Sequence, residues 1–97
     1  MKNSGLNETI TESIISIAKQ HGVEKVLLFG SRARGDFRKT SDIDIAVSGG
    51  DIARFVADIH EETPTLLMFD IVNLDGSVQK ELMQSIEQEG ITIYEKV

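Results

Sequence analysis

The segment Asp42–Ser48 limits the possible folds of this chain most strongly, because its large apolar residues recur at every second position, alternating with Asp42, Asp44 and Ala46. A β-strand places successive side chains on opposite faces of its sheet. The apolar set predicts a strand with one face in the core, formed by Ile43, Ile45 and Val47. Asp42 and Asp44 fall together on the opposite face, about 6–7 Å apart along the backbone.

Two carboxylates held side by side on a strand repel each other unless a cation or a proton relieves the repulsion. Mg²⁺ is a suitable cation, since proteins bind it with one or two carboxylates together with the phosphates of a substrate. For Asp42 and Asp44 alone, an alternative stays open: a strand face that meets water, with two aspartates of no chemical role.

A third aspartate, Asp70, lies inside the otherwise apolar run Leu66–Val72. An unpaired charge buried in such a strand is costly, so Asp70 either pairs with a cation or shares the exposed sheet face with Asp42 and Asp44. Three converging carboxylates predict a two-metal site for phosphoryl transfer. An aspartate of an edge strand that faces water is the alternative.

The positive charge of the chain is concentrated in one loop, although the net charge is −6. Four of the ten basic residues lie within eight positions: Arg32, Arg34, Arg38 and Lys39. The preceding Gly30 and Ser31 offer close backbone approach, an amide and a hydroxyl to a phosphate, and the arginines offer charge-assisted contacts to a triphosphate. Such a loop suits one small polyanion, whereas the acidic balance argues against general nucleic-acid binding.

The remaining pattern predicts alternating helices and strands. Helices are expected between Asn7 and Gly22, from Asp51 to Ile59, and over 77–89. Strands are expected over 25–29, 42–48, 65–74 and 91–94, and residues 31–41 form a loop that can contain one helical turn. This alternation predicts a single α/β (α+β) domain over residues 1–97, with helices packed on one sheet.

Several classes of protein are excluded by what the sequence lacks. Without cysteine there is no disulfide framework or thiolate metal site. The polar N-terminus has no signal-peptide core, and no apolar run reaches the about 20 residues needed to span a bilayer, so we expect a cytoplasmic protein without a membrane partner. His21 and His60 have no metal-ligand spacing and are interpreted as structural or surface residues.

Gly30-Ser31, followed after ten residues by Asp42-Ile43-Asp44, resembles the signature of the DNA polymerase β-like nucleotidyltransferase superfamily. The longer strings Phe29–Gly35 and Ser41–Val47 are similar to its minimal branch, the MNT proteins. Asp70 falls where that family carries its third carboxylate. The resemblance is closest over residues 25–75, and it implies the nucleotidyltransferase fold, a single mixed sheet with helices packed on it.

The resemblance also implies roles for individual residues. The catalytic and metal-binding set, which would hold two Mg²⁺ ions, is Asp42, Asp44 and Asp70. The set that would bind the nucleotide is Gly30, Ser31, Arg32 and Arg34, and which arginine contacts phosphate stays open. The implied reaction moves AMP, or another NMP, from ATP or a related triphosphate to a hydroxyl acceptor.

MNT proteins are frequently paired with helical HEPN proteins as antitoxin and ribonuclease toxin, and some transfer AMP to a tyrosine of the toxin. The short chain leaves little material for an acceptor-binding domain, so we expect the acceptor hydroxyl on a HEPN-type protein partner. Two alternatives stay open. One is a non-catalytic antitoxin that acts by steric occlusion, and the other is a small-molecule nucleotidyltransferase that needs a partner subunit.

Overall fold

The computed structural model of the chain describes residues 4–97, so the first three residues of the polar N-terminus lie outside it. Helices and strands alternate along the described part, as the sequence predicts. The helices are α1 (Glu8–Gln20), α2 (Ser31–Arg34), α3 (Ile52–Glu62) and α4 (Lys80–Glu89). The strands are β1 (Lys25–Phe29), β2 (Ile43–Ser48), β3 (Phe69–Asn73) and β4 (Ile91–Glu95).

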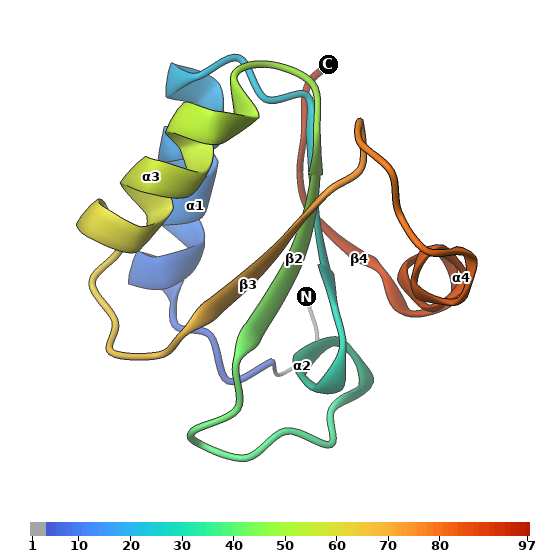
Figure 1. Cartoon of the computed structure of the whole chain (residues 1–97). Coiled ribbons are helices and arrows are strands. Elements are labelled where there is room, and N and C mark those ends of the chain that lie inside the picture. The colour runs from blue at the N-terminus through green and yellow to red at the C-terminus, as the bar shows by residue number, and fades with distance from the viewer. Residues whose placement is uncertain (1–3) are drawn as a thin grey trace.

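The strands form one mixed sheet in the order β3-β2-β1-β4. β1 runs antiparallel to both β2 and β4, whereas β2 and β3 are parallel. A parallel pair needs a crossover connection, and α3 provides it. Figure 1 shows α1 and α3 together on one side of the sheet and α4 on the other. The predicted α+β architecture is therefore confirmed.

The main core lies between the sheet and the pair α1–α3. Ile43, Ile45 and Val47 of β2 are completely buried there, against residues such as Ile14 of α1 and Phe55 of α3. This confirms the face that the alternation in β2 predicts. Burying each of these side chains stabilises the fold by about 1.5–3 kcal/mol, so β2 contributes strongly to the stability of the core.

The second face of the sheet is covered only in part. Phe29, Ala46 and Ile86 form a smaller buried cluster there, with Val72 and Leu82 packed against it. α4 supplies two of these residues and so covers one end of the face. The other end, beside α2, holds polar residues of β2 and β3.

The helix caps follow the predicted chemistry. The Asn7 side chain accepts a hydrogen bond from the Ile10 amide at 2.9 Å, and the Asp51 side chain accepts one from the Arg54 amide at 3.2 Å. Each bond satisfies an amide that the first helical turn leaves without a partner.

The two histidines have structural positions, in agreement with their interpretation from the sequence. His21 Nε2 lies 2.5 Å from Asp58 Oδ2 and joins the end of α1 to α3. The His60 ring packs edge-on against Phe69, with ring centroids 6.4 Å apart.

Two predicted elements begin three or more residues later in the structure. The strand expected over 65–74 begins only at Phe69, because the Leu67 amide donates to Thr65 Oγ1 at 3.1 Å and the chain bends locally instead of pairing. The helix expected from 77 begins at Lys80, so Val78 precedes it. Within the described residues, none of the helices combines the length and the apolar character needed to cross a membrane.

Candidate active site

The sheet pairing brings two of the three predicted carboxylates together. Asp44 of β2 and Asp70 of β3 are direct register partners. Since alternate residues of a strand share a face, both project from the α4 side of the sheet, away from the main core. Asp42 lies just before β2 rather than within it, and it is exposed.

The pKa of Asp44 is raised above the ordinary carboxyl value. Burial is the largest cause, and the negative charges of Asp70 and Asp42 follow. Arg34 and Arg32 oppose the shift with their positive charges. The three aspartates therefore act on one another electrostatically, and the repulsion that the sequence predicts is present at Asp44.

Gly30 forms the wall of the site beside Asp44. Its φ is 74°, in the left-handed region, and a Cβ at this position would collide with the Asp44 carboxylate. Both the backbone angle and the close approach require glycine. Ser31 follows at the start of α2 and is half-buried.

Arg32 does not face the carboxylates as a free cation. Its side chain is only 2% exposed, and its guanidinium donates to the carbonyl oxygens of Ser4 at 2.9 Å, Lys39 at 3.3 Å and Ser41 at 3.0 Å. It also lies 4.9 Å from the ring centroid of Phe37. In this structure the Arg32 donors bind backbone carbonyl groups of the N-terminal segment and of residues 38–41, so of the two arginines predicted to bind the nucleotide Arg34 is the accessible one, and the phosphate contact stays a prediction.

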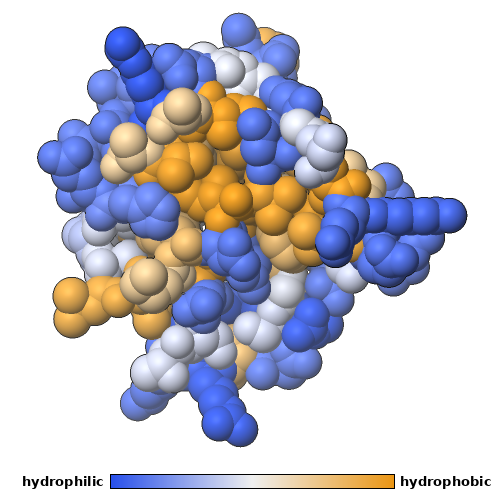
Figure 2. All heavy atoms as spheres, in the orientation of Figure 1, coloured by the Kyte–Doolittle hydropathy of each residue, from blue (hydrophilic) through white to orange (hydrophobic). Residues whose placement is uncertain are grey.

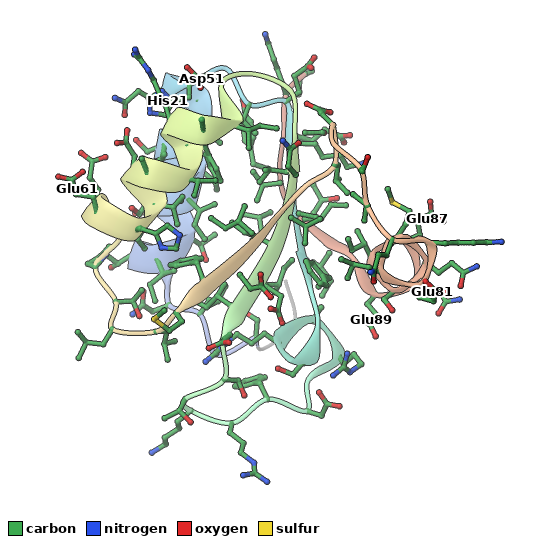
Figure 3. The ribbon with its side chains drawn as sticks, in the orientation of Figure 1. His21, Asp51, Glu61, Glu81, Glu87 and Glu89 are labelled. Carbon is green, nitrogen blue, oxygen red and sulfur yellow. The ribbon has the colours of Figure 1, made fainter. Side chains whose placement is uncertain are left out.

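Arg34, in contrast to Arg32, is exposed. Its Nε donates to Asp36 Oδ2 at 3.2 Å and its Nη1 donates to Glu89 Oε2 at 3.0 Å, and these hydrogen bonds raise its pKa. The other carboxylate oxygen of Glu89, Oε1, accepts from the Gly30 amide at 3.2 Å. Figure 3 shows Glu89 on the side of α4 nearer to α2. No sequence pattern identified Glu89, because only the fold brings residue 89 next to residue 30.

The donor set fits a magnesium ion together with a nucleotide. Among residues 4–97, no three His, Asp or Glu side chains are arranged to hold a metal ion on their own. Mg²⁺ needs fewer protein ligands than this, since it accepts one or two carboxylates and takes its other ligands from substrate phosphates and water. The Asp44–Asp70 pair supplies two such carboxylates, and a cation would relieve the excess negative charge at Asp44.

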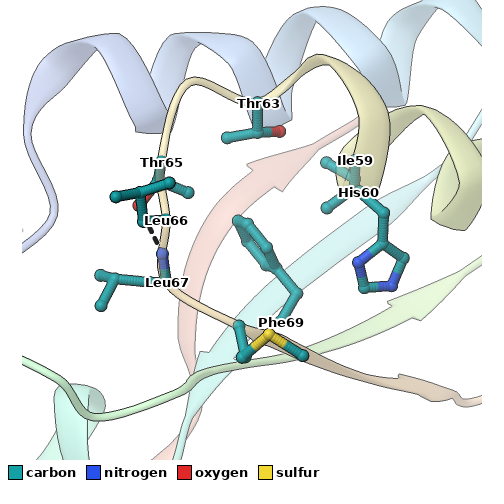
Figure 4. A pocket seen from close by; sticks show the side chains of 8 residues that line it. Ile59, His60, Thr63, Thr65, Leu66, Leu67 and Phe69 are labelled. Atoms are coloured by element: carbon teal, nitrogen blue, oxygen red, sulfur yellow. Dashed lines mark hydrogen bonds between the residues drawn. The ribbon is translucent and has the colours of Figure 1, made fainter.

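A separate hollow of about 230 Å³ lies between the end of α3 and the start of β3 (Figure 4). Its lining includes His60, Thr63, Leu66, Met68 and Phe69. Phe69 packs into the main core, so its side chain lies on the α3 side of the sheet. Its neighbour Asp70 points to the opposite face, because successive residues of a strand alternate. The hollow that Phe69 lines is therefore on the α3 side and not on the side of the carboxylates. It is therefore distinct from the candidate active site.

Comparisons with known proteins show the family to which this chain belongs. Residues 12–97 match the family model described as polymerase beta, nucleotidyltransferase. A curated protein of Methanocaldococcus jannaschii, provisionally named a protein adenylyltransferase, is 48% identical over 46 residues. That match covers 47% of this chain and 48% of the relative, so the chain spans about half of the relative's length.

Two solved structures are similar over most of the chain. A chain in the crystal structure of a toxin–antitoxin with AMP-PNP has a TM-score of 0.71 at 27% identity, over 89% of this chain and 73% of that chain. The second is a structure of a tri-AMPylated Shewanella oneidensis HEPN toxin in complex with an MNT antitoxin. It matches with a TM-score of 0.63 at 25% identity, over 89% of this chain and 70% of that chain.

The buried position of Arg32 predicts a large loss of stability in Arg32→Ala. Removing the guanidinium leaves several carbonyl groups without a donor, at a cost of roughly 3 kcal/mol in the free energy of unfolding. Arg38→Ala removes a nearby exposed side chain from the same loop and is expected to change stability by less than about 0.5 kcal/mol. Urea denaturation of both variants checks this, and equal stabilities would contradict the structural role of Arg32.

The raised pKa of Asp44 predicts that Asp44→Asn is more stable than the parent at pH 7 without metal or nucleotide. The folded state disfavours the charged carboxylate, so this group lowers stability progressively as the pH rises from the ordinary pKa of 3.8 to the higher folded-state pKa; the penalty is complete above that pKa and absent well below 3.8. The difference in melting temperature should therefore shrink as the pH falls. Glu87→Gln, at an exposed carboxylate of α4, serves as the control. A parent that is more stable than Asp44→Asn at pH 7 would contradict the electrostatic account.

Proposed function

We propose that this chain, which belongs to the polymerase β nucleotidyltransferase family, transfers AMP from ATP to a hydroxyl group on a partner protein. The observation that carries the proposal is the pairing of Asp44 with Asp70 across β2 and β3, with Gly30 against the Asp44 carboxylate. A carboxylate cluster next to a phosphate-accepting backbone is the arrangement that metal-dependent phosphoryl transfer requires.

Asp44 and Asp70 would hold Mg²⁺ together with the phosphates of the nucleotide, and the charge of the nearby Asp42 would favour the cation; when bound, Mg²⁺ neutralises charge on the triphosphate and on the leaving group. The Gly30 amide and the Ser31 amide and hydroxyl would bind phosphate oxygens, because the glycine leaves room for close approach. Arg34 would add a charge-assisted contact from the exposed side of the loop.

Asp70 is exposed at the open edge of the sheet and would accept the proton of the acceptor hydroxyl. The hydroxyl oxygen then forms a bond to the α-phosphorus of ATP. The bond between the α-phosphorus and the bridging oxygen breaks, and pyrophosphate leaves with that electron pair. AMP remains on the acceptor, so atoms and charges balance.

A protein acceptor is supported by the surface around Asp70. Leu66 and Met68, just before it in the chain, are exposed at 102% and 66%. Figure 2 shows hydrophobic residues gathered across the middle of the face that β3 crosses. Leu66 and Met68 line the hollow on the α3 side, and an exposed apolar surface next to the edge strand that carries Asp70 suits contact with another protein better than contact with a small polar metabolite.

The nature of that protein is proposed from the comparisons. The relative from M. jannaschii is provisionally named a protein adenylyltransferase, and one similar structure contains an AMPylated HEPN toxin with an MNT antitoxin. We infer that the present chain is likewise an antitoxin, and that its acceptor is a hydroxyl of a HEPN-type toxin.

The proposal predicts a mass increase on the partner. Incubation of the chain with ATP, Mg²⁺ and the HEPN-type product of a neighbouring gene should add one or more AMP units to that product, measured by intact mass spectrometry. Asp42→Asn should slow the addition by about two to three orders of magnitude, as expected when one electrostatic stabiliser is removed, while the two proteins still co-purify.

The matched control is Asp51→Asn, which changes an aspartate at the start of α3 to an equally good helix cap and should leave the transfer rate unchanged. One outcome contradicts the proposal. A partner whose mass does not change with the parent chain, and which the Asp42→Asn variant inhibits equally well, would make this chain a steric inhibitor.

A further inference from the structure

The last residue of α4 occupies the donors beside the carboxylate cluster. Glu89 accepts a hydrogen bond from the Gly30 amide with Oε1 and one from Arg34 Nη1 with Oε2, at 3.2 and 3.0 Å. The carboxylate therefore bridges a backbone amide and a guanidinium, with one oxygen on each. These are the two kinds of donor that bind a phosphate group best.

The proposed function assigns the same two donors to the triphosphate. A carboxylate and a phosphate are both anionic oxygen acceptors, so they compete for one amide and one guanidinium. We propose that Glu89 is an internal competitor for the nucleotide: its carboxylate takes the place of a phosphate, and binding of the triphosphate displaces it. This inference rests on the proposed function and adds that Glu89 lowers the affinity of the site for the nucleotide.

The position of Glu89 allows it to leave. Its side chain is 22% exposed, and it borders a hollow of about 540 Å³ between α2 and the start of β4, next to Ala33 and Ile91. α4 is fixed to the sheet independently, because Ile86 is buried and Leu82 packs beside it. The side chain can therefore rotate into the hollow or into solvent without release of the helix.

Glu89 also stands out from the other acidic residues of its helix. Glu81 and Glu87 are exposed, and Figure 3 shows Glu87 on the side of α4 away from α2. Only Glu89 of these three carboxylates contacts the loop that carries Gly30 and Arg34. A nucleotide can bind this loop only after the Glu89 carboxylate has moved away. The apparent affinity for the nucleotide is therefore lower than the intrinsic affinity, in proportion to the fraction of molecules in which Glu89 has left the loop.

The test compares Glu89→Gln with the parent and with Glu87→Gln. Glutamine keeps the shape and one accepting oxygen, so the fold is retained, but it removes the charge that competes with phosphate. Glu87→Gln removes the same charge from the same helix without touching the loop. Calorimetric titrations use two probes: ATP with Mg²⁺, and inorganic tripolyphosphate with Mg²⁺.

We expect Glu89→Gln to bind both probes roughly fivefold more tightly than the parent, the factor that an ion pair of this exposure is worth. Glu87→Gln should bind like the parent. In an Arg34→Ala background, the gain from Glu89→Gln should become smaller, because the two anions then compete for the amide alone. Unchanged or weaker binding by Glu89→Gln, or an equal gain in Glu87→Gln, would overturn the inference.

The titrations also separate this inference from the proposed function. If the parent and Glu89→Gln bind ATP with the same affinity, Glu89 is a structural residue and the proposed function stands. If neither protein binds ATP or tripolyphosphate, both the competition and the assignment of Gly30 and Arg34 to phosphate are wrong.

Discussion

The pairing of β2 with both of its neighbours fixes the whole site. β1 places Phe29 opposite Asp44, so that the following Gly30 lies against the Asp44 carboxylate. β3 places Asp70 opposite the same residue on the other side. The buried face of β2, with Ile45 at its centre, makes a shift of register by one residue unfavourable, because such a shift would send the apolar side chains to the open face. The packing of the core therefore keeps the carboxylates of Asp44 and Asp70 close together although they repel each other.

Two arginines of the basic loop have different environments: Arg32 is buried and Arg34 is exposed. Arg32 donates to backbone carbonyl groups, whereas Arg34 two positions later donates to the carboxylates of Asp36 and Glu89. A buried guanidinium that donates to neutral carbonyls rigidifies the loop, and an exposed one stays available to an incoming anion. The loop can therefore keep its shape when a triphosphate replaces the acidic partners of Arg34.

Much of this arrangement can be predicted from the sequence, where local periodicity and burial determine the outcome. The alternation in β2, the caps at Asn7 and Asp51 and the end of β1 at Phe29 all follow from side-chain chemistry within a few residues. The burial of Arg32 and the exposure of Arg34 do not follow in this way, because both are arginines in a polar segment, and Arg32 is covered by residues that the fold brings to it, among them Ser4 and Ser41. The contact of Glu89 depends on the path of α4 across the sheet, and no local pattern contains it.

The central claim is that a divalent cation and a nucleotide together relieve the repulsion among the carboxylates. The most direct measurement is the melting temperature of the parent chain and of Asp70→Asn with ATP, in Mg²⁺ and in EDTA. For the parent, ATP with Mg²⁺ at about 100 times its dissociation constant should add about 2.7 kcal/mol of stability, and ATP in EDTA should add little. Asp70→Asn should lose most of the Mg²⁺-dependent gain. An equal gain in EDTA, or an unchanged gain in Asp70→Asn, would contradict the account.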